Sequence, residues 1–183
     1  ELKKEFTVKR MQKAGAVFDI EKLKWMNGQY LMNLDLNTVA AYSKPWFEKA
    51  GIDISNHSKY LAVVDNARKR VNLIPEMIEY AQPFYTDLTF NDEDLLVLQK
   101  SSAKSVFDFI LKKLNSNDYW REDELKSLLK ETSEKTGVKG KNLFIPLRLA
   151  LIGSQHGPDI PLIIQILGID ATLKRLEFQK ITS

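Results

Sequence analysis

Apolar residues recur at intervals of three and four positions along most of the chain, which is the pattern of helices with one buried face. The first clear example follows Asp19, whose side chain can cap a helix, and places Leu23, Met26, Tyr30 and Leu31 on one side. No segment shows the sustained alternation of apolar and polar residues that is typical of a strand. The pattern therefore predicts an all-α protein.

A second helix is predicted from its cap at Asn37 to Gly51, with a kink or break at Pro45. Further helices are predicted to start at Ser55, near Pro75, at Asn91, at Ser102 and after Trp120. Three short helices are predicted to follow, over 143–153, 158–168 and 170–180. The periodicity lapses over 84–94, before the new cap at Asn91, and we place a subdomain boundary there. No recurring signature indicates a solenoid.

Charge is spread unevenly over the 183 residues, although the net charge is only +3. Residues 1–34 carry seven Lys or Arg against four Asp or Glu, residues 35–137 fourteen against seventeen, and residues 138–183 six against three. Basic ends and an acidic middle suit an extended polyanion that touches only parts of the protein, but solvated helix surfaces produce the same counts. Both interpretations stay open at this stage.

The residues offer little for catalysis or for a metal. Cysteine is absent, and the two histidines, His57 and His156, lie far apart in the sequence. No glycine-rich phosphate loop and no paired nucleophile and histidine are found. The acidic runs 92–94 and 122–124 are interpreted as first-turn residues that complement the helix dipole. This chain is a poor candidate for a self-sufficient enzyme, and we expect neither a metal nor a cofactor in it.

Hydropathy predicts no membrane span, because apolar runs such as the four residues LALI within 149–152 are far shorter than the roughly 20 residues that a span needs. The opening ELKKEFTVKR has no apolar core of a signal peptide. We therefore expect a cytoplasmic protein. The missing initiator methionine and the amphipathic start lead us to expect an excised fragment.

Two stretches carry a specific resemblance. FTVKRMQKAGAVFDIEKLKWMNGQYL resembles the segment just after the KMSKS loop of bacterial glutamyl-tRNA synthetases, where VFD, KL, WMN and Y recur at this spacing. TGVKGKNLFIPLRLALIGSQHGPDIPLIIQILG resembles the closing region of the same family, with its PLR and LG elements. The resemblance spans nearly the whole chain, although residues 86–133 match in pattern more than in identity.

The resemblance implies the C-terminal, anticodon-binding part of a class I glutamate–tRNA ligase. Residues 1–34 would end the stem-contact domain, and two helical subdomains, 35–88 and 89–183, would form an α-helical cage. The HIGH and KMSKS motifs, which serve ATP, Mg and glutamate in the parent enzyme, are absent from these residues. The implied partner is tRNA(Glu), with tRNA(Gln) as a second candidate, and the parent enzyme is expected to be a monomer.

Arg148 is the main candidate site residue. On the wheel it lies between Phe144 and Ile152, on a segment that is otherwise apolar. From the residues alone, pairing with a carboxylate such as Asp159, or extension along Phe144 to water, is the favoured interpretation. The resemblance reverses that order, because the arginine of PLR in this family points into the anticodon pocket and contacts a base.

Other site residues also follow from the resemblance. Arg70, at the end of the helix that begins at Ser55, falls where an arginine in some members reads the third anticodon base; the alternative is a cation that favours the helix C-terminus, while Lys69 points to solvent. Gly157 and Pro158 fall in the loop that closes over the first anticodon base. Some members carry a hydroxyl residue in place of Gly157, so only backbone contacts are expected there.

The remaining candidates are weaker. His156 is interpreted either as a stacking partner of a base or as a loop residue without a role. Trp25 and Tyr30 are assigned to packing, although with Asn27 they look suited to nucleic acid. Four lysines are the candidates for contacts to the tRNA backbone: Lys22, Lys24, Lys139 and Lys141.

Two alternative functions stay open. One is the anticodon-binding region of a class I lysyl-tRNA synthetase, which would be expected to depart from the WMN and PLR signatures. The other is a helical module whose basic ends bind a partner protein.

Overall fold

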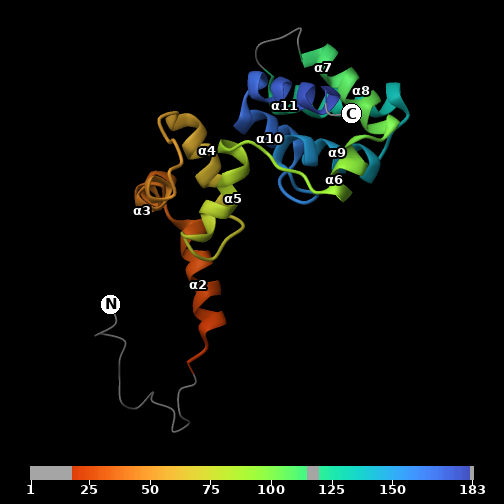
Figure 1. Cartoon of the computed structure of the whole chain (residues 1–183). Helices are drawn as coiled ribbons and strands as arrows, with labels where there is room; N and C mark the ends of the chain where they lie inside the picture. The colour runs from red at the N-terminus through yellow and green to blue at the C-terminus, as the bar shows by residue number, and fades with distance from the viewer. Residues whose placement is uncertain (1–17, 115–119, 182–183) are drawn as a thin grey trace, which may run out of the picture.

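The computed structural model describes residues 18–114 and 120–181, with side chains described as far as residue 177 at the C-terminal end (Figure 1). Within these ranges the chain forms ten α-helices of 7 to 15 residues and no strand. The all-α class predicted from the sequence is confirmed. The predicted stem-contact segment 1–34 lies partly outside the described residues.

The first helical group precedes residues 86–91, which we call the junction because the two helical groups meet there. It comprises α2 (Ile20–Asn33), α3 (Leu36–Lys49), α4 (His57–Ala67) and α5 (Glu76–Tyr85). Helices α3, α4 and α5 pack against one another, whereas α2 projects away from them (Figure 1). Phe47 and Tyr60 meet edge to face in the centre of this group, with ring centroids 5.0 Å apart.

The second helical group contains the rest of the described chain. It comprises α6 (Asp92–Leu98), α7 (Ser101–Leu114), α8 (Glu122–Thr136), α9 (Lys141–Ile152), α10 (Ile160–Leu167) and α11 (Ile169–Ile181). Helix α9 contacts α6, α7, α10 and α11, and it is buried on most sides. A helix surrounded in this way must be apolar nearly all round, which explains why its sequence is so rich in leucine and isoleucine.

The helix starts follow side-chain caps, and the sequence identified some of them. Asp19 and Asn91 cap α2 and α6 as predicted, each accepting a hydrogen bond from a backbone N–H three residues on. The prediction of Asn37 as a cap is wrong, because Asp35 caps α3. Asn56, one residue after the predicted start, caps α4. Neighbouring Asp and Asn residues are equivalent caps on sequence criteria, so the choice between them depends on which face must be buried.

Pro45, where the sequence predicts a kink or break, lies inside the continuous helix α3. Proline cannot donate the backbone hydrogen bond of its position, which weakens a helix interior. Val39, Ser43 and Phe47 are fully buried on one face of α3. We attribute the continuity of the helix to the burial of this face.

The two groups meet at residues 86–91, within the segment 84–94 where the periodicity lapses. Helix α4 of the first group also contacts α10 of the second, and the buried side chains of both groups belong to one connected core. The limits 35–88 and 89–183 of the two subdomains stay predictions.

Candidate nucleic-acid interface

Arg148 lies on α9 between Leu147 and Leu149, which are both buried, and its own side chain is partly exposed. Its Nε donates a hydrogen bond to the carbonyl oxygen of Pro158 at 3.1 Å. The ion pair with Asp159 that was weighed from the sequence is not formed. Among the described residues, Nη1 and Nη2 of Arg148 have no hydrogen-bond partner, so the outer part of the guanidinium can bind a ligand.

The loop that receives Arg148 spans residues 153–159 and depends on glycine. Gly157 has a φ of 149°, and a Cβ there would lie 2.9 Å from Cδ1 of Ile152. Both facts oppose any side chain at this position. Gly157 is exposed, whereas Pro158, expected near the base, is buried and presents only its carbonyl oxygen to Arg148. His156, beside them, is also exposed.

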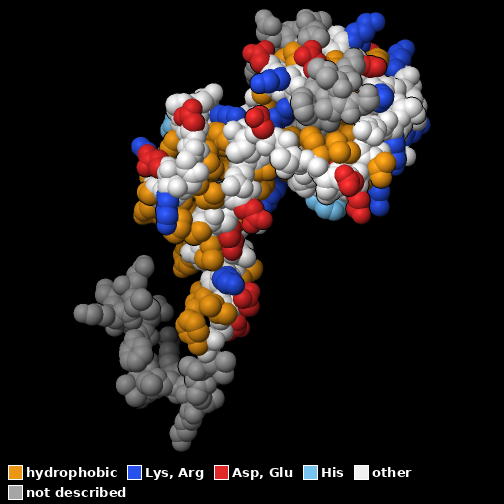
Figure 2. Space-filling model, viewed as in Figure 1, with side chains coloured by type: hydrophobic (Ala, Val, Ile, Leu, Met, Phe, Trp, Pro, Cys, Tyr) orange, Lys and Arg blue, Asp and Glu red, His pale blue; other side chains and the backbone are white. Residues whose placement is uncertain are grey.

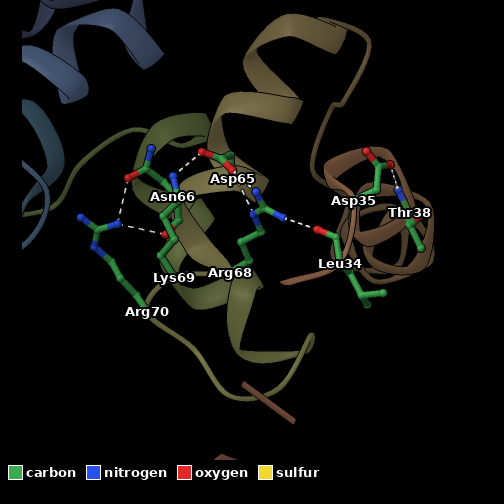
Figure 3. Close-up of polar contacts among 8 residues, drawn as sticks. All are labelled: Leu34, Asp35, Thr38, Asp65, Asn66, Arg68, Lys69 and Arg70. Carbon is green, nitrogen blue, oxygen red and sulfur yellow. Dashed lines mark hydrogen bonds and ion pairs between the residues drawn. The ribbon is translucent and has the colours of Figure 1, made fainter. Parts of the chain in front are cut away.

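Arg70 follows the last turn of α4, which ends at Ala67, and is exposed. Its Nη1 donates to both oxygens of Asn66, at 3.0 Å to the backbone carbonyl and 2.8 Å to Oδ1 (Figure 3). The guanidinium carbon lies 5.8 Å from the centroid of the Tyr80 ring. The side chain is therefore held in one orientation, although it reaches solvent.

The residues just before Arg70 connect α4 to the end of α2 (Figure 3). Arg68 donates to the carbonyl oxygen of Leu34 at 2.6 Å and forms an ion pair with Asp65 at 2.7 Å. Lys69, predicted to point to solvent, is exposed but also forms an ion pair with Asp65, at 2.5 Å. Burial raises the pKa of Asp65, but hydrogen bonds from Lys69 and Arg68 outweigh it and hold that pKa below its ordinary value.

The four candidate lysines lie in two separate places, one on α2 and one at the start of α9. Lys22 and Lys24 are on α2, where Lys24 forms an ion pair with Glu21 at 3.0 Å. Lys139 and Lys141 are exposed at the start of α9, in the other group. The structure does not gather the four lysines into one patch.

Comparison with known proteins identifies the fold and the family. The family profile described as "Anticodon binding domain" matches residues 38–179, well over half of the chain. This chain belongs to the anticodon-binding domain family. In fold it is similar to the crystal structure of a glutamate tRNA ligase from Elizabethkingia meningosepticum, with a TM-score of 0.85 over 96% of this chain and 35% of that chain, at 23% identity.

Curated relatives point the same way. The glutamate–tRNA ligase of Listeria innocua is 36% identical over 184 residues, which cover 95% of this chain and 37% of the relative. That of Halalkalibacterium halodurans is 35% identical over 182 residues, covering 96% of this chain and 38% of the relative. The anticodon-binding chain thus spans a little over a third of the length of these relatives. None of its described helices is both long and apolar enough to cross a membrane.

Helix α2, which precedes the part of the chain matched by the family profile, corrects one prediction. Trp25 and Tyr30, assigned to packing, are 59% and 66% exposed. Figure 2 shows hydrophobic side chains gathered over α2 and α3. Their spacing indicated a buried face, but the described part of the chain supplies no element that covers it. On the same helix Gly28 is buried. It lies so close to Asn72 that a Cβ added to Gly28 would overlap Oδ1 of Asn72.

Arg175 joins the two helical groups of the anticodon-binding domain. From α11 it donates to the carbonyl oxygens of Pro83 at 2.7 Å and Thr86 at 3.0 Å, at the end of α5 and just beyond it. It also donates to the carbonyl oxygen of Leu151, on the same helix as Arg148. Burial lowers the pKa of Arg175, which the nearby charge of Asp87 partly offsets. A single side chain thus links the junction to the helix that carries Arg148.

The junction also contains a pocket of about 680 Å³. Its lining includes Lys174 and Arg175, but also the carboxylates of Asp87 and Glu177. This mixture of charges does not favour a polyanion, because the acidic groups oppose the basic ones. The pocket is therefore not part of the candidate interface.

Tyr85 makes the junction sensitive to alkaline pH. Its hydroxyl is buried without a hydrogen-bond partner among the described residues, and burial, more than the neighbouring Tyr60 and Asp53, raises its pKa to about 12. A raised pKa favours the neutral phenol in the folded state. The neutral phenol therefore contributes fully to the free energy of unfolding at pH values below 10.0, the ordinary pKa of tyrosine. This contribution is lost as the pH rises from 10.0 towards 12.

We therefore expect Tyr85→Phe to be at least as stable as the parent chain at neutral pH and to lose less stability between about pH 8 and pH 11. The cation–π contact of Lys59, 4.6 Å from the ring centroid, can persist on phenylalanine. Urea unfolding at both pH values measures this difference. Tyr42→Phe, at a tyrosine that is 59% exposed, is the control. An equal loss of stability in the parent chain and in Tyr85→Phe would contradict the prediction.

Several residues of the site were not singled out from the sequence. Asn66 holds Arg70, and Arg175 holds the junction. Asn66 carries a local signal, because it lies between the buried residues Val63 and Ala67 at helical spacing, where a polar residue needs a partner. Arg175 carries none, since its acceptors are backbone carbonyls that lie far away in the sequence.

Proposed function

We propose that this chain recognises the anticodon of tRNA(Glu) as part of a glutamate–tRNA ligase. The observation that carries the proposal is the match to the anticodon-binding domain over 38–179. The similarity to glutamate–tRNA ligases of Listeria innocua and Halalkalibacterium halodurans supports the choice of glutamate over other tRNA classes.

The two arginines have the chemistry for this task. Bases of an anticodon loop are unpaired, so their edges can be read by arginine donors and their faces can stack on flat groups. Arg148 and Arg70 each use part of the guanidinium to bind the protein and leave other donors towards solvent. In this proposal Arg148 and Arg70 read bases, and Gly157 offers backbone contacts near the first anticodon base. The four lysines would contact phosphates, which position the RNA without reading it.

The ligation of glutamate to tRNA with ATP and Mg belongs, in this proposal, to parts of the longer protein outside these residues. The chain then binds tRNA without charging it, and the parent enzyme acts in the cytoplasm. Binding of tRNA(Gln) and the monomeric state of the parent enzyme are further parts of the proposal.

Salt dependence of tRNA binding tests the proposal directly. The affinity of the 183-residue chain for tRNA(Glu) should fall as salt rises, with a logarithmic slope of about −0.7 for each single-stranded phosphate contact. Filter binding in a salt series measures the slope, and tRNA(Lys) and a DNA duplex serve as comparison ligands. Absence of salt-sensitive affinity for any tRNA would contradict the proposal, and a preference for tRNA(Lys) would favour the lysyl alternative.

A further inference from the structure

A buried amide in the last turn of α4 has a defined partner. Asn66 is only 7% exposed and sits among Val63, Val64 and Ala67, which are fully buried. A primary amide in such a place is costly unless it is hydrogen bonded. The amide oxygen of Asn66 accepts a hydrogen bond from Arg70 at 2.8 Å. The burial of this amide is thus tied to the orientation of one exposed arginine.

Arg70 is fixed at two points. Its Nη1 donates to the backbone and side-chain oxygens of Asn66, which together use both hydrogens of that nitrogen. The guanidinium also lies over the face of Tyr80, at cation–π distance. A free arginine side chain loses conformational entropy when it is immobilised. Here much of that loss is already incurred before any ligand binds, which favours binding through preorganisation.

One edge of Arg70 stays available. Nε and Nη2 have no partner among the described residues, and in Figure 3 the second terminal nitrogen points away from Asn66. Two adjacent N–H donors are complementary to two adjacent acceptors, such as O2 and N3 of cytosine. On the Watson–Crick edge of guanine an N–H donor lies next to O6, so the same arginine edge would meet a donor. Guanine presents two adjacent acceptors, O6 and N7, only on its other edge. The fixed arginine edge therefore discriminates between the two bases when the Watson–Crick edge of the base faces it.

We propose that Asn66 is a positioning residue for Arg70, with Tyr80 as its second support, and that it sets the preference of this chain for cytosine over guanine at the base that Arg70 reads. This inference rests on the proposed function of Arg70. Asn66 itself touches no RNA in this proposal. It acts by holding the guanidinium so that Nε and Nη2 face the base.

A double-mutant cycle on the full 183-residue chain tests the inference. The probe is the anticodon stem-loop of tRNA(Glu), with either C or G as its third anticodon base, and the readout is the ratio of the two affinities. Asn66→Ala should lower this ratio about 3- to 10-fold, as expected for the loss of one hydrogen bond. In the Arg70→Ala background, Asn66→Ala should lower it no further.

Conservative and control variants separate positioning from folding. Asn66→Asp keeps an acceptor for Arg70 and should retain the preference for C. Tyr80→Leu removes the second support from another helix and should lower the preference even if Asn66→Ala folds poorly. Ser43→Ala, at another fully buried polar residue of the first group, should change the melting temperature without changing the ratio.

The outcomes distinguish the two proposals. If Arg70→Ala abolishes the preference while Asn66→Ala and Tyr80→Leu retain it, the positioning role is overturned and the function of Arg70 stands. If Asn66→Ala lowers the ratio equally with and without Arg70, its role is structural only, which also overturns the inference. If Arg70→Ala leaves the ratio unchanged, the base-reading role of Arg70 fails and the positioning role fails with it.

Discussion

Replacing Arg175 with methionine should lower the free energy of unfolding by about 3 kcal/mol, because hydrogen bonds from a charged donor to three carbonyl oxygens are lost together. Methionine retains much of the apolar stem of arginine, so the loss of packing contributes little to the change in stability. The acceptors, on Pro83, Thr86 and Leu151, would lose a shared partner at a junction where solvent only partly replaces it. No other single side chain among the described residues links the two groups through so many hydrogen bonds.

Urea unfolding followed by circular dichroism measures the effect. Lys174→Met is the matched control, since Lys174 is the exposed neighbour on the same helix and lines the same pocket. A surface substitution of this kind usually changes stability by no more than about 0.5 kcal/mol. Equal losses in the two variants would show that Arg175 contributes only as a charge on α11 and does not hold the junction together.

Arg148→Ala should weaken binding of the anticodon stem-loop by about 1–3 kcal/mol, which corresponds to about 5- to 150-fold in affinity, as expected for a bidentate contact to a base. The guanidinium stands on a helix whose neighbouring side chains are buried, so water competes less for its donors than it does on an open surface. Its hydrogen bond to Pro158 is a single contact from a charged but partly exposed donor, so stability should fall by only about 1.5 kcal/mol.

The affinity should be measured with stem-loops that carry single changes at each anticodon base, because a base contact predicts a loss at one position only. Lys44→Ala removes one exposed positive charge of the first group and controls for long-range electrostatics. A uniform loss for all loops would identify Arg148 as a phosphate contact. A large drop in melting temperature with unchanged affinity would show a structural role.

The sequence predicted the class of the fold because helical periodicity is a local property. The same holds for the caps Asp19 and Asn91, and for the acidic first turns of α6 and α8. The wrong cap of α3 arose because two nearby residues, Asp35 and Asn37, are both good caps. Only the burial of Val39 and Phe47 decides between them. The aromatic residues of α2 have helical spacing, but periodicity does not tell whether another element covers a face.

In the candidate site, too, local features could be predicted from the sequence and contacts between distant residues could not. Arg148, Arg70 and Gly157 could be named from the sequence because a charge in an apolar run, a cation beyond a helix end and a family motif are visible in the chain itself. The hydrogen bond from Arg148 to Pro158 could not, since it depends on how the loop 153–159 folds back. Asn66 was not singled out from the sequence, although its spacing places a polar residue on a buried face.

By itself the sequence determined that this protein is helical, where most helices begin, and which family motifs it carries, because these depend on residues a few positions apart. Only the tertiary structure decided which donors are already used and which remain for a ligand. Arg175 binds carbonyls 24 to 92 residues away, and Arg70 is held between Asn66 on one helix and Tyr80 on another. Such contacts depend on how the helices pack together, and no local pattern records them.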